Sequence, residues 1–448
     1  MSNSSTINMT EGNPTSLLIR FSIPMLIGNL VQQLYNFADS AIVGNYVGKD
    51  AFAAVGATTS ITFLFFAMCN GFANGGGIIA AQHYGAGDDV RIKRCIVDTG
   101  FIMMIFPLVI GTLAFFLADP ILVLLETPSD IMHDSMVYLR VNACGLVFVS
   151  LYNYASAMLR AFGDSKTPLY FLFFSCIVNI GLDLLFVCVF DMAVFGAAIA
   201  TIISQFLSAA ACLVYAEKKN PYFNLTKADL KLDGEVSGQV LKLGAPLSLQ
   251  FSLIAISCMA LQKVVNSFGT DTIAAFSATS RIEQIIHQPY QTLSAALSTY
   301  IGQNFGAKKM DRIKEGLKKS VLIMVIFSVA MLPVMQFFGE AIIGLFVDNQ
   351  TVIAMGAKAL RISSLFYIML GTIYVIRGVL NGMGDSLFAI INGAVEVVGR
   401  FVVPILLTSV ATIGLWGIWW SVGVVWAISG FTAWLRYVGF KRRRGYKI

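Results

Sequence analysis

Long apolar stretches separated by short polar loops run through the whole chain. An α-helix of about 20 apolar residues crosses the roughly 30 Å hydrocarbon core of a bilayer. Each stretch has about that length, although glycine and proline interrupt several. The pattern therefore predicts twelve transmembrane helices, near residues 17–44, 51–75, 95–118, 135–159, 167–190, 194–216, 239–266, 272–298, 317–339, 356–380, 386–410 and 413–438.

The two halves of the chain repeat each other. VGKDAFAAVGATTSI at 47–61 matches FGTDTIAAFSATSRI at 268–282, and AQHYGAGDDVRIK at 81–93 matches GQNFGAKKMDRIK at 302–314, in each case 221 residues later. Six spans per half is an even number, so an axis along the membrane normal relates the halves. We predict an all-α polytopic membrane protein of two six-helix bundles. The predicted domains are a first bundle at 1–217, a cytoplasmic linker at 218–237 and a second bundle at 238–448.

Composition and charge support a membrane protein. The chain is 57% hydrophobic and 12% charged, which excludes an ordinary soluble domain of this size. Its net charge of +6 comes from lysines and arginines in alternate short loops and at the C-terminus, so it does not indicate a nucleic-acid partner. By the positive-inside rule both termini face the cytoplasm, and we expect a multi-pass protein of the plasma membrane.

The first span breaks two rules of the membrane interior. Pro24 lacks a backbone N–H, so it kinks the helix or lets it bend. Asp39 places a carboxyl group where its charge is costly. In the fifth span Asn179 and Asp183 share one helix face, and Thr201 adds a hydroxyl in the sixth.

These polar groups lie at one depth. From the rise per residue, Asp39, Asp183 and Thr201 are roughly 8–11 Å below the outer surface. Oxygen groups at one depth on three helices are suited to a proton or to a hard cation such as Na⁺. The positions 221 residues later hold Ala260, Arg400, Pro404 and Val422, without a carboxylate. Confinement to the first half favours a functional site, the alternative being that each acid pairs with a buried base or caps a helix.

The second half carries charges of its own. Glu396 and Arg400 are four residues apart and can neutralise each other, which favours a structural role. Glu283 is a candidate substrate contact, and its neighbour Arg281 points in another direction. His287, on the same helix, is expected to be a packed residue more than a proton carrier.

Two further sets need less explanation. Three bases near span ends are expected to snorkel to the membrane surface: Lys263, Arg361 and Arg377. Aromatic side chains suit flat lipophilic cations, although most in such a protein face lipid or other helices. The candidate cleft residues are Tyr35, Tyr152, Tyr154, Glu283 and Tyr290.

Several catalytic patterns are absent from the sequence. It has no GxxxxGK[ST] loop, no HExxH and no GxSxG. We therefore expect a protein that is not an enzyme and that needs neither a cofactor nor an ATPase partner. We also expect it to act as a monomer. The expected partners are small amphiphilic molecules and membrane lipid.

The chain as a whole resembles the multidrug and toxic compound extrusion (MATE) family. The resemblance covers twelve spans, two six-helix repeats, and the loop AAQHYGAG at 80–87 with its echo IGQNFGAK at 301–308. The first-span aspartate with its upstream proline, the Asn-x-x-x-Asp of the fifth span and the sixth-span threonine are similar to the cation site of the prokaryotic DinF-like branch. The resemblance implies that Pro24 is the bend and that Asp39, Asn179, Asp183 and Thr201 hold the coupling ion.

The function that we expect is antiport. A proton or sodium gradient would drive the export of amphiphilic, often cationic, small molecules by alternating access. The alternative is a flippase for lipid-linked oligosaccharides from the same superfamily. A scaffold or receptor would not need acids confined to the first half, and a primary pump would need a nucleotide-binding partner.

Overall fold

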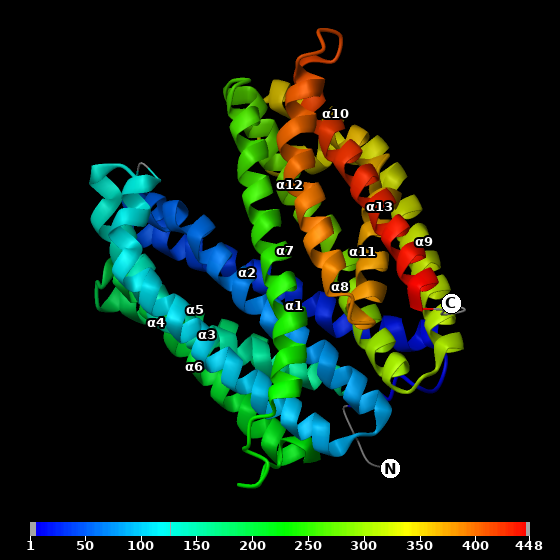
Figure 1. Ribbon diagram of the computed structural model, residues 1–448. Helices are drawn as coiled ribbons and strands as arrows, with labels where there is room; N and C mark the ends of the chain where they lie inside the picture. The colour runs from blue at the N-terminus through cyan, green and yellow to red at the C-terminus, as the bar shows by residue number, and fades with distance from the viewer. Residues whose placement is uncertain (1–5, 126, 445–448) are drawn as a thin grey trace. The chain divides into compact units, whose positions relative to one another are not determined.

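The structure is a computed structural model that describes residues 6–125 and 127–444, so the outermost ends of the two predicted bundles lie outside it. The described chain is helical throughout (Figure 1). Its α-helices are α1 (Pro14–Ile42), α2 (Lys49–Ala86), α3 (Asp89–Leu124), α4 (Ser129–Ala161), α5 (Lys166–Asp183), α6 (Ala193–Lys219), α7 (Gly234–Asn266), α8 (Thr270–Gly306), α9 (Met310–Gly344), α10 (Gln350–Ser364), α11 (Tyr367–Gly382), α12 (Ser386–Thr408) and α13 (Gly417–Arg444). Short π-helical turns follow α1 and α5, at Val43–Val47 and Leu184–Val189, and 3₁₀ turns lie at Pro221–Phe223 and Gly414–Trp416.

The helices reproduce the predicted spans. Ten of them are long and apolar enough to cross a membrane, and the bent pair α10 and α11 makes an eleventh. The twelfth is α8, whose 37 residues suffice in length but include Arg281, Glu283 and His287. This helix contains the span predicted at 272–298.

One predicted span is broken. The run at 356–380 forms two helices that meet at a 52° bend. No proline causes the bend: the N–H of Leu365 bonds to the carbonyl of Ile362 at 3.2 Å, three residues earlier. The carbonyl of Arg361, which a continuous helix would use, accepts from Gln336 Nε2 of α9 at 2.9 Å. A side chain of a neighbouring helix therefore replaces a ladder hydrogen bond at the break.

Glycines let α2 pack closely. A Cβ on Gly75 would lie 2.7 Å from the Cα of Gly244 on α7. A Cβ on Gly77 would lie 3.1 Å from the carbonyl oxygen of Ala157 on α4. The glycine-rich stretch at 71–80 therefore serves close packing inside α2, which continues to Ala86.

The repeated Gly-Asp-Ser sequence starts a helix in each half. Gly163 (φ 87°) and Gly384 (φ 79°) adopt the left-handed conformation that glycine tolerates best. In the first half Asp164 then accepts hydrogen bonds from Lys166 N and Thr167 N at 3.1 and 3.0 Å. In the second half the carboxylate of Asp385 instead accepts hydrogen bonds from Nε and Nη2 of Arg436, both at 2.7 Å.

The chain divides into two compact units that exchange the beginnings of two helices. Unit 1 comprises residues 1–8 and 23–248, and unit 2 comprises residues 9–22 and 249–448. The first turns of α1 therefore belong to unit 2, and the linker and the start of α7 belong to unit 1. This differs from the sequence boundaries at 217 and 238. Each helix passes from one unit to the other within two residues of a proline, Pro24 in α1 and Pro246 in α7.

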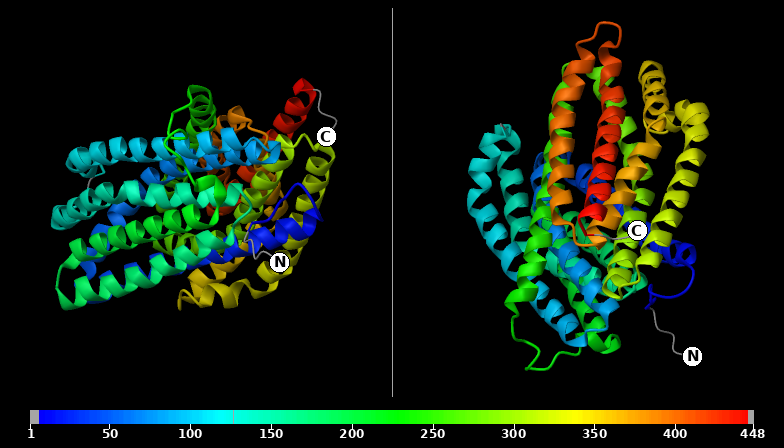
Figure 2. Two further views of the ribbon diagram at one scale, coloured as in Figure 1. Left: turned by 90° about the horizontal axis from the view of Figure 1, so that it is seen from below. Right: turned by 45° about the vertical axis from the view of Figure 1, so that its right-hand side comes forward.

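In unit 2 the α8–α9 loop holds the chain ahead of α1 (Figure 2). The side chain of Arg312 donates to the carbonyls of Gly12 and Met9 at 3.0 and 3.2 Å. Lys309 Nζ donates to the carbonyl of Thr10 at 3.0 Å, and Asn304 Nδ2 donates to that of Met9 at 3.0 Å. We call this contact of residues 9–12 with Asn304, Lys309 and Arg312 the α1 clamp.

In unit 1 the start of α3 holds the chain ahead of α7 in the same way. Arg94 Nη1 donates to the carbonyl of Lys231 at 2.6 Å. Lys93 pairs with Asp229 at 3.1 Å, and Asp98 accepts from the N–H of Asp233 at 3.2 Å. In each half, residues in or directly after the repeated loop sequence thus contact the segment ahead of a proline-containing helix.

Candidate cation site

The two acids of the first half meet inside unit 1. Asp39 on α1 is 9% exposed and Asp183, at the end of α5, is fully buried. Their carboxyl groups interact with each other. Two carboxylates that interact in this way repel each other when both are ionised.

Three uncharged groups complete the cluster. Asn179 Nδ2 on α5 and the hydroxyl of Tyr35 on α1 each donate to Thr201 Oγ1 on α6 at 3.4 Å. Asn179 is fully buried, and its Oδ1 receives no hydrogen bond within the described chain. All four residues predicted for the cation site are therefore in one place, on the three helices that the sequence indicated.

No base neutralises the acids in the described part of the chain. Among residues 6–125 and 127–444 no ion pair involves Asp39 or Asp183. Both oxygens of Asp183 and Oδ1 of Asp39 are buried and accept no hydrogen bond from these residues. Buried oxygens without donors are costly, because they have lost the hydrogen bonds that water made to them. The alternative of pairing with a buried base is thus not seen.

A π-helical turn lies close after each acid: it begins directly after Asp183, at Leu184, and four residues after Asp39, at Val43. The N–H of Gly48 bonds to the carbonyl of Val43 at 3.3 Å, and that of Phe190 to the carbonyl of Leu185 at 3.0 Å, both five residues back. Inserted π turns are often found at functional sites, where they redirect side chains. A small apolar cluster surrounds the two turns: Val43, Ala51, Val55, Val187, Val194 and Ala197. Hydropathy does not reveal a π turn, so sequence reasoning missed these two.

A small hollow adjoins the site. It has an empty volume of about 140 Å³, its open mouth included. Its lining is Gln32, Tyr35, Leu172, Ser175, Cys176 and Gln205. Pockets for drug-sized ligands measure roughly 300–1,000 Å³, so this hollow is too small for such a molecule. Within the described chain no three His, Cys, Asp or Glu side chains are grouped to hold a metal ion.

A family model decides the classification. The model described as MatE matches residues 24–185 and 246–406. The chain belongs to the MatE family. The two matched segments begin at Pro24 and Pro246, so each covers one repeat from its proline onwards.

Similar proteins share this MatE architecture over their whole length. The "Probable multidrug resistance protein YpnP" of Bacillus subtilis is 30% identical, with 96% of each chain covered. The "Multidrug export protein MepA" of Staphylococcus saprophyticus is 25% identical over 93% of this chain and 92% of its own. Solved structures include an outward-facing MATE family transporter (TM-score 0.90, 22% identity, all of both chains) and a MATE in the bent conformation (TM-score 0.89, 22% identity, 99% and 98% covered).

The tyrosines proposed for a substrate cleft have packing contacts. Tyr152 and Tyr154 donate to the carbonyls of Pro168 and Ile96 at 2.8 and 2.7 Å within unit 1. Tyr290, in unit 2, is 1% exposed and shares a hydrogen bond of 2.7 Å with Ser328. Tyr35, by contrast, donates to Thr201 of the predicted cation site.

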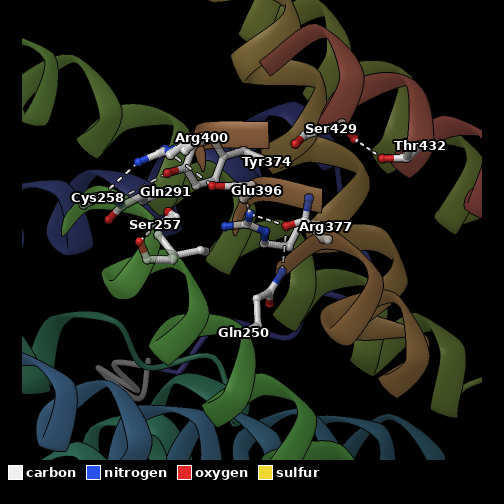
Figure 3. Close-up of polar contacts among 12 residues, drawn as sticks. Gln250, Ser257, Cys258, Gln291, Tyr374, Arg377, Glu396, Arg400, Ser429 and Thr432 are labelled. Carbon is white, nitrogen blue, oxygen red and sulfur yellow. Dashed lines mark hydrogen bonds and ion pairs between the residues drawn. The ribbon is translucent and has the colours of Figure 1, made fainter. Parts of the chain in front are cut away.

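In unit 2 the structure corrects the interpretation of Arg377. It was expected to snorkel, but it is 8% exposed and pairs with Glu396 at 3.3 Å. It also donates to Asn392 Oδ1 at 2.6 Å. Arg400 pairs with the other oxygen of Glu396 at 3.4 Å, as predicted, so one carboxylate serves two guanidinium groups (Figure 3).

The polar residues of α8 are divided. Arg281 is exposed, whereas Glu283 is half-buried and its Oε1 accepts no hydrogen bond in the described chain. The ring of His287 packs edge-on against Trp426 and Tyr374, with centroids 5.5 and 6.2 Å away. The packed role expected for His287 is what the structure shows.

Proposed function

We propose that this MatE-family multidrug efflux transporter is a cation-coupled antiporter, which takes up a proton or Na⁺ and exports amphiphilic, often cationic, small molecules. The observation that carries the proposal is the buried pair Asp39 and Asp183, whose oxygens lack both a basic partner and hydrogen-bond donors in the described chain. A pair in that state binds a cation, because the cation removes the repulsion between the carboxylates.

Coupling needs a path from the site to the rest of the protein. Asp39 lies fifteen residues beyond Pro24 on the same helix, about 22 Å at 1.5 Å per residue. Since α1 leaves unit 2 beside Pro24, a bend there moves the Asp39 end without disturbing the α1 clamp. The ion would shift the balance between two states by binding one of them more tightly. The names of YpnP and MepA support multidrug export as the transported function.

The remaining expectations follow from the family and the loop charges. The chain is an integral membrane protein, and the proposal places it in the plasma membrane with both termini in the cytoplasm. The proposed transporter works as a monomer without a cofactor or an ATPase partner.

The test uses inside-out vesicles and ethidium as a fluorescent lipophilic cation. A proton gradient and a sodium gradient are imposed separately, with the acid or Na⁺ inside. We expect one of them to drive ethidium uptake and Asp39→Asn to abolish that uptake, because the amide neither binds a proton in this range nor attracts Na⁺ strongly. Asp348→Asn, the same change at an exposed loop position, is the matched control.

Normal uptake by Asp39→Asn protein that is inserted at the wild-type level would refute coupling through this site. Uptake driven by protons alone makes the pair a protonation site. Uptake that needs Na⁺ makes Asn179 and Thr201 part of its coordination. A response to neither gradient would contradict antiport and favour a flippase.

A further inference from the structure

Unit 2 contains a buried polar chain that the proposed coupling does not use. It runs from Gln250 on α7 through Asn392 on α12 to Arg377 on α11, with Gln250 Nε2 donating to Asn392 Oδ1 at 2.8 Å. It continues through Glu396 to Arg400, both on α12 (Figure 3). The far end of the chain is a hydrogen bond of 2.9 Å from Arg400 Nη1 to the sulfur of Cys258 on α7.

This chain has an excess of positive charge. Arg377 and Arg400 are always protonated, and the one carboxylate that both contact is Glu396. Both contacts are long for charged hydrogen bonds, at 3.3 and 3.4 Å, where about 2.7–2.9 Å is usual. Glu283 acts on Arg400 electrostatically but forms no ion pair with either arginine in the described chain. Arg400 is otherwise bonded to a thiol, which is a weak acceptor.

Several donors along this chain have no acceptor. Within the described residues, Arg377 Nε, Arg400 Nε and Asn392 Nδ2 are buried and unpaired. Arg377 and Asn392 are 8% and 1% exposed, so water does not reach them freely. A buried guanidinium stabilises a protein only when its donors are satisfied, so this arrangement is costly as it stands. An acceptor with negative charge at Arg400 would satisfy the Nε of that residue and balance the charge of the cluster.

The first half shows that the fold does not require these charges. The residues 221 positions before Arg377, Glu396 and Arg400 are Ser156, Ser175 and Asn179. Asn179 and Arg400 are thus equivalent positions of the two repeats. Asn179 belongs to the candidate cation site with its two acids, whereas Arg400 carries a positive charge. The two repeats have thus acquired opposite polarity at equivalent places.

We propose that the Arg377–Glu396–Arg400 cluster is a binding site for an anionic oxygen group, a carboxylate or a phosphate, carried by an amphiphilic ligand. The group replaces Glu396 at Arg400, where Nε and Nη2 offer the forked pair of donors that matches two anionic oxygens. Glu396 then remains with Arg377 alone. The proposal rests on the proposed function only for the amphiphilic nature of the ligand, since binding needs no ion gradient.

Two dyes with one skeleton make the test. Rhodamine B has a free carboxylate and its ethyl ester does not, so they differ in the group that the cluster would bind. Their affinities are measured by equilibrium dialysis, without a gradient, on protein in phosphatidylcholine nanodiscs. We expect Arg400→Gln to weaken binding of the acid about tenfold or more and to leave that of the ester unchanged, because a charged hydrogen bond is lost. Arg361→Gln, in the exposed pair with Glu340, is the matched control and should change neither.

Glu396→Gln separates a binding role from a structural one. If Glu396 competes with the ligand for Arg400, its neutral isostere binds the acid more tightly than wild type does. If the cluster only holds α11 and α12 together, the same variant lowers the melting temperature and gains no affinity for the acid. Arg400→Lys keeps the charge and should retain part of the acid binding, which covers the case that Arg400→Gln fails to fold.

The source of the anionic group is resolved by the lipid. With phosphatidylglycerol added to the nanodiscs, a lipid phosphate in the site would weaken acid binding in wild type but not in Arg400→Gln. An equal change in both proteins assigns the site to an acidic solute. The proposal is overturned if Arg400→Gln weakens both dyes equally or neither, or if Glu396→Gln fails to strengthen acid binding. Failure of antiport in vesicles leaves these results unaffected, so the two proposals fail separately.

Discussion

At the scale of the residue, Asp229 shows the effect of several donors on one carboxylate. Its Oδ2 accepts from the N–H and the hydroxyl of Thr226 at 2.8 and 2.7 Å and from Lys93 at 3.1 Å. The donors from Thr226 foremost, and then Lys93, lower the pKa of Asp229 to about 2. An ordinary aspartate has a pKa of about 3.9.

The lowered pKa gives a pH dependence of known sign. A carboxyl group with a depressed pKa in the folded state stabilises that state above its unfolded pKa and loses this effect as the pH falls through the folded value. We expect Asp229→Asn to melt below wild type above about pH 4 and the gap to close as the pH falls to about 2. Melting curves by intrinsic fluorescence measure it. Asp348→Asn should show no such gap, and a gap for Asp229→Asn that persists at pH 2 would contradict the prediction.

The cation-site residues could be predicted from the sequence, whereas the Arg377–Glu396–Arg400 cluster could not. Asp39, Asp183 and Thr201 could be placed together because the helical rise fixes depth. Depth does not fix which way a side chain points around its helix, so Arg377, near a span end, was indistinguishable from a snorkelling residue. Its partner Asn392 comes from another helix, and nothing in the local pattern marks that pairing.

At the scale of the element, close backbone contact decides how α2 packs. Gly75 lies against Gly244 with no space for a side chain between the two backbones. Gly56, on the same helix, has nothing within 4 Å of the position that a Cβ would take. The two glycines therefore form a matched pair for one substitution.

We expect Gly75→Ala to destabilise unit 1 by about 1–3 kcal/mol, because neither backbone can move away without shifting its helix. Gly56→Ala should be neutral or slightly stabilising, since alanine favours the helix. Thermal unfolding followed by fluorescence-detected size exclusion compares the two. Equal melting temperatures for both variants would show that α7 is free to move away from α2.

Elements also mark where prediction from hydropathy ends. Apolar runs of spanning length predicted twelve spans, because length and apolarity are all that a bilayer requires. The tenth run was predicted as one helix, although it forms two, α10 and α11. At the break after Ser364 the carbonyl of Arg361 accepts from Ser364 Oγ of its own helix and from Gln336 of another helix, both at 2.9 Å. The sequence around this break contains neither proline nor glycine, so hydropathy and residue type do not predict it.

At the scale of the whole molecule, the α1 clamp ties the N-terminal segment to the second half of the chain. We expect Arg312→Ala to speed amide exchange at residues 9–12 about tenfold, because charged hydrogen bonds to two carbonyls are lost. Lys314→Ala, an exposed position two residues further on, is the control. Hydrogen exchange with mass spectrometry measures both. Unchanged protection in Arg312→Ala would mean that Lys309 and Asn304 suffice to hold the segment.

The duplication was evident in the sequence, but the exchange of helix starts between the units was not, because a repeat shows what is equivalent and not what is adjacent. Had the two halves been separate polypeptides, the same exchange would make them a domain-swapped dimer. The second half produced alone would lack residues 9–22, which contain the segment that the α1 clamp holds. Fragments cut in the linker should therefore accumulate in cells only when they are produced together, as obligate partners that one gene now encodes.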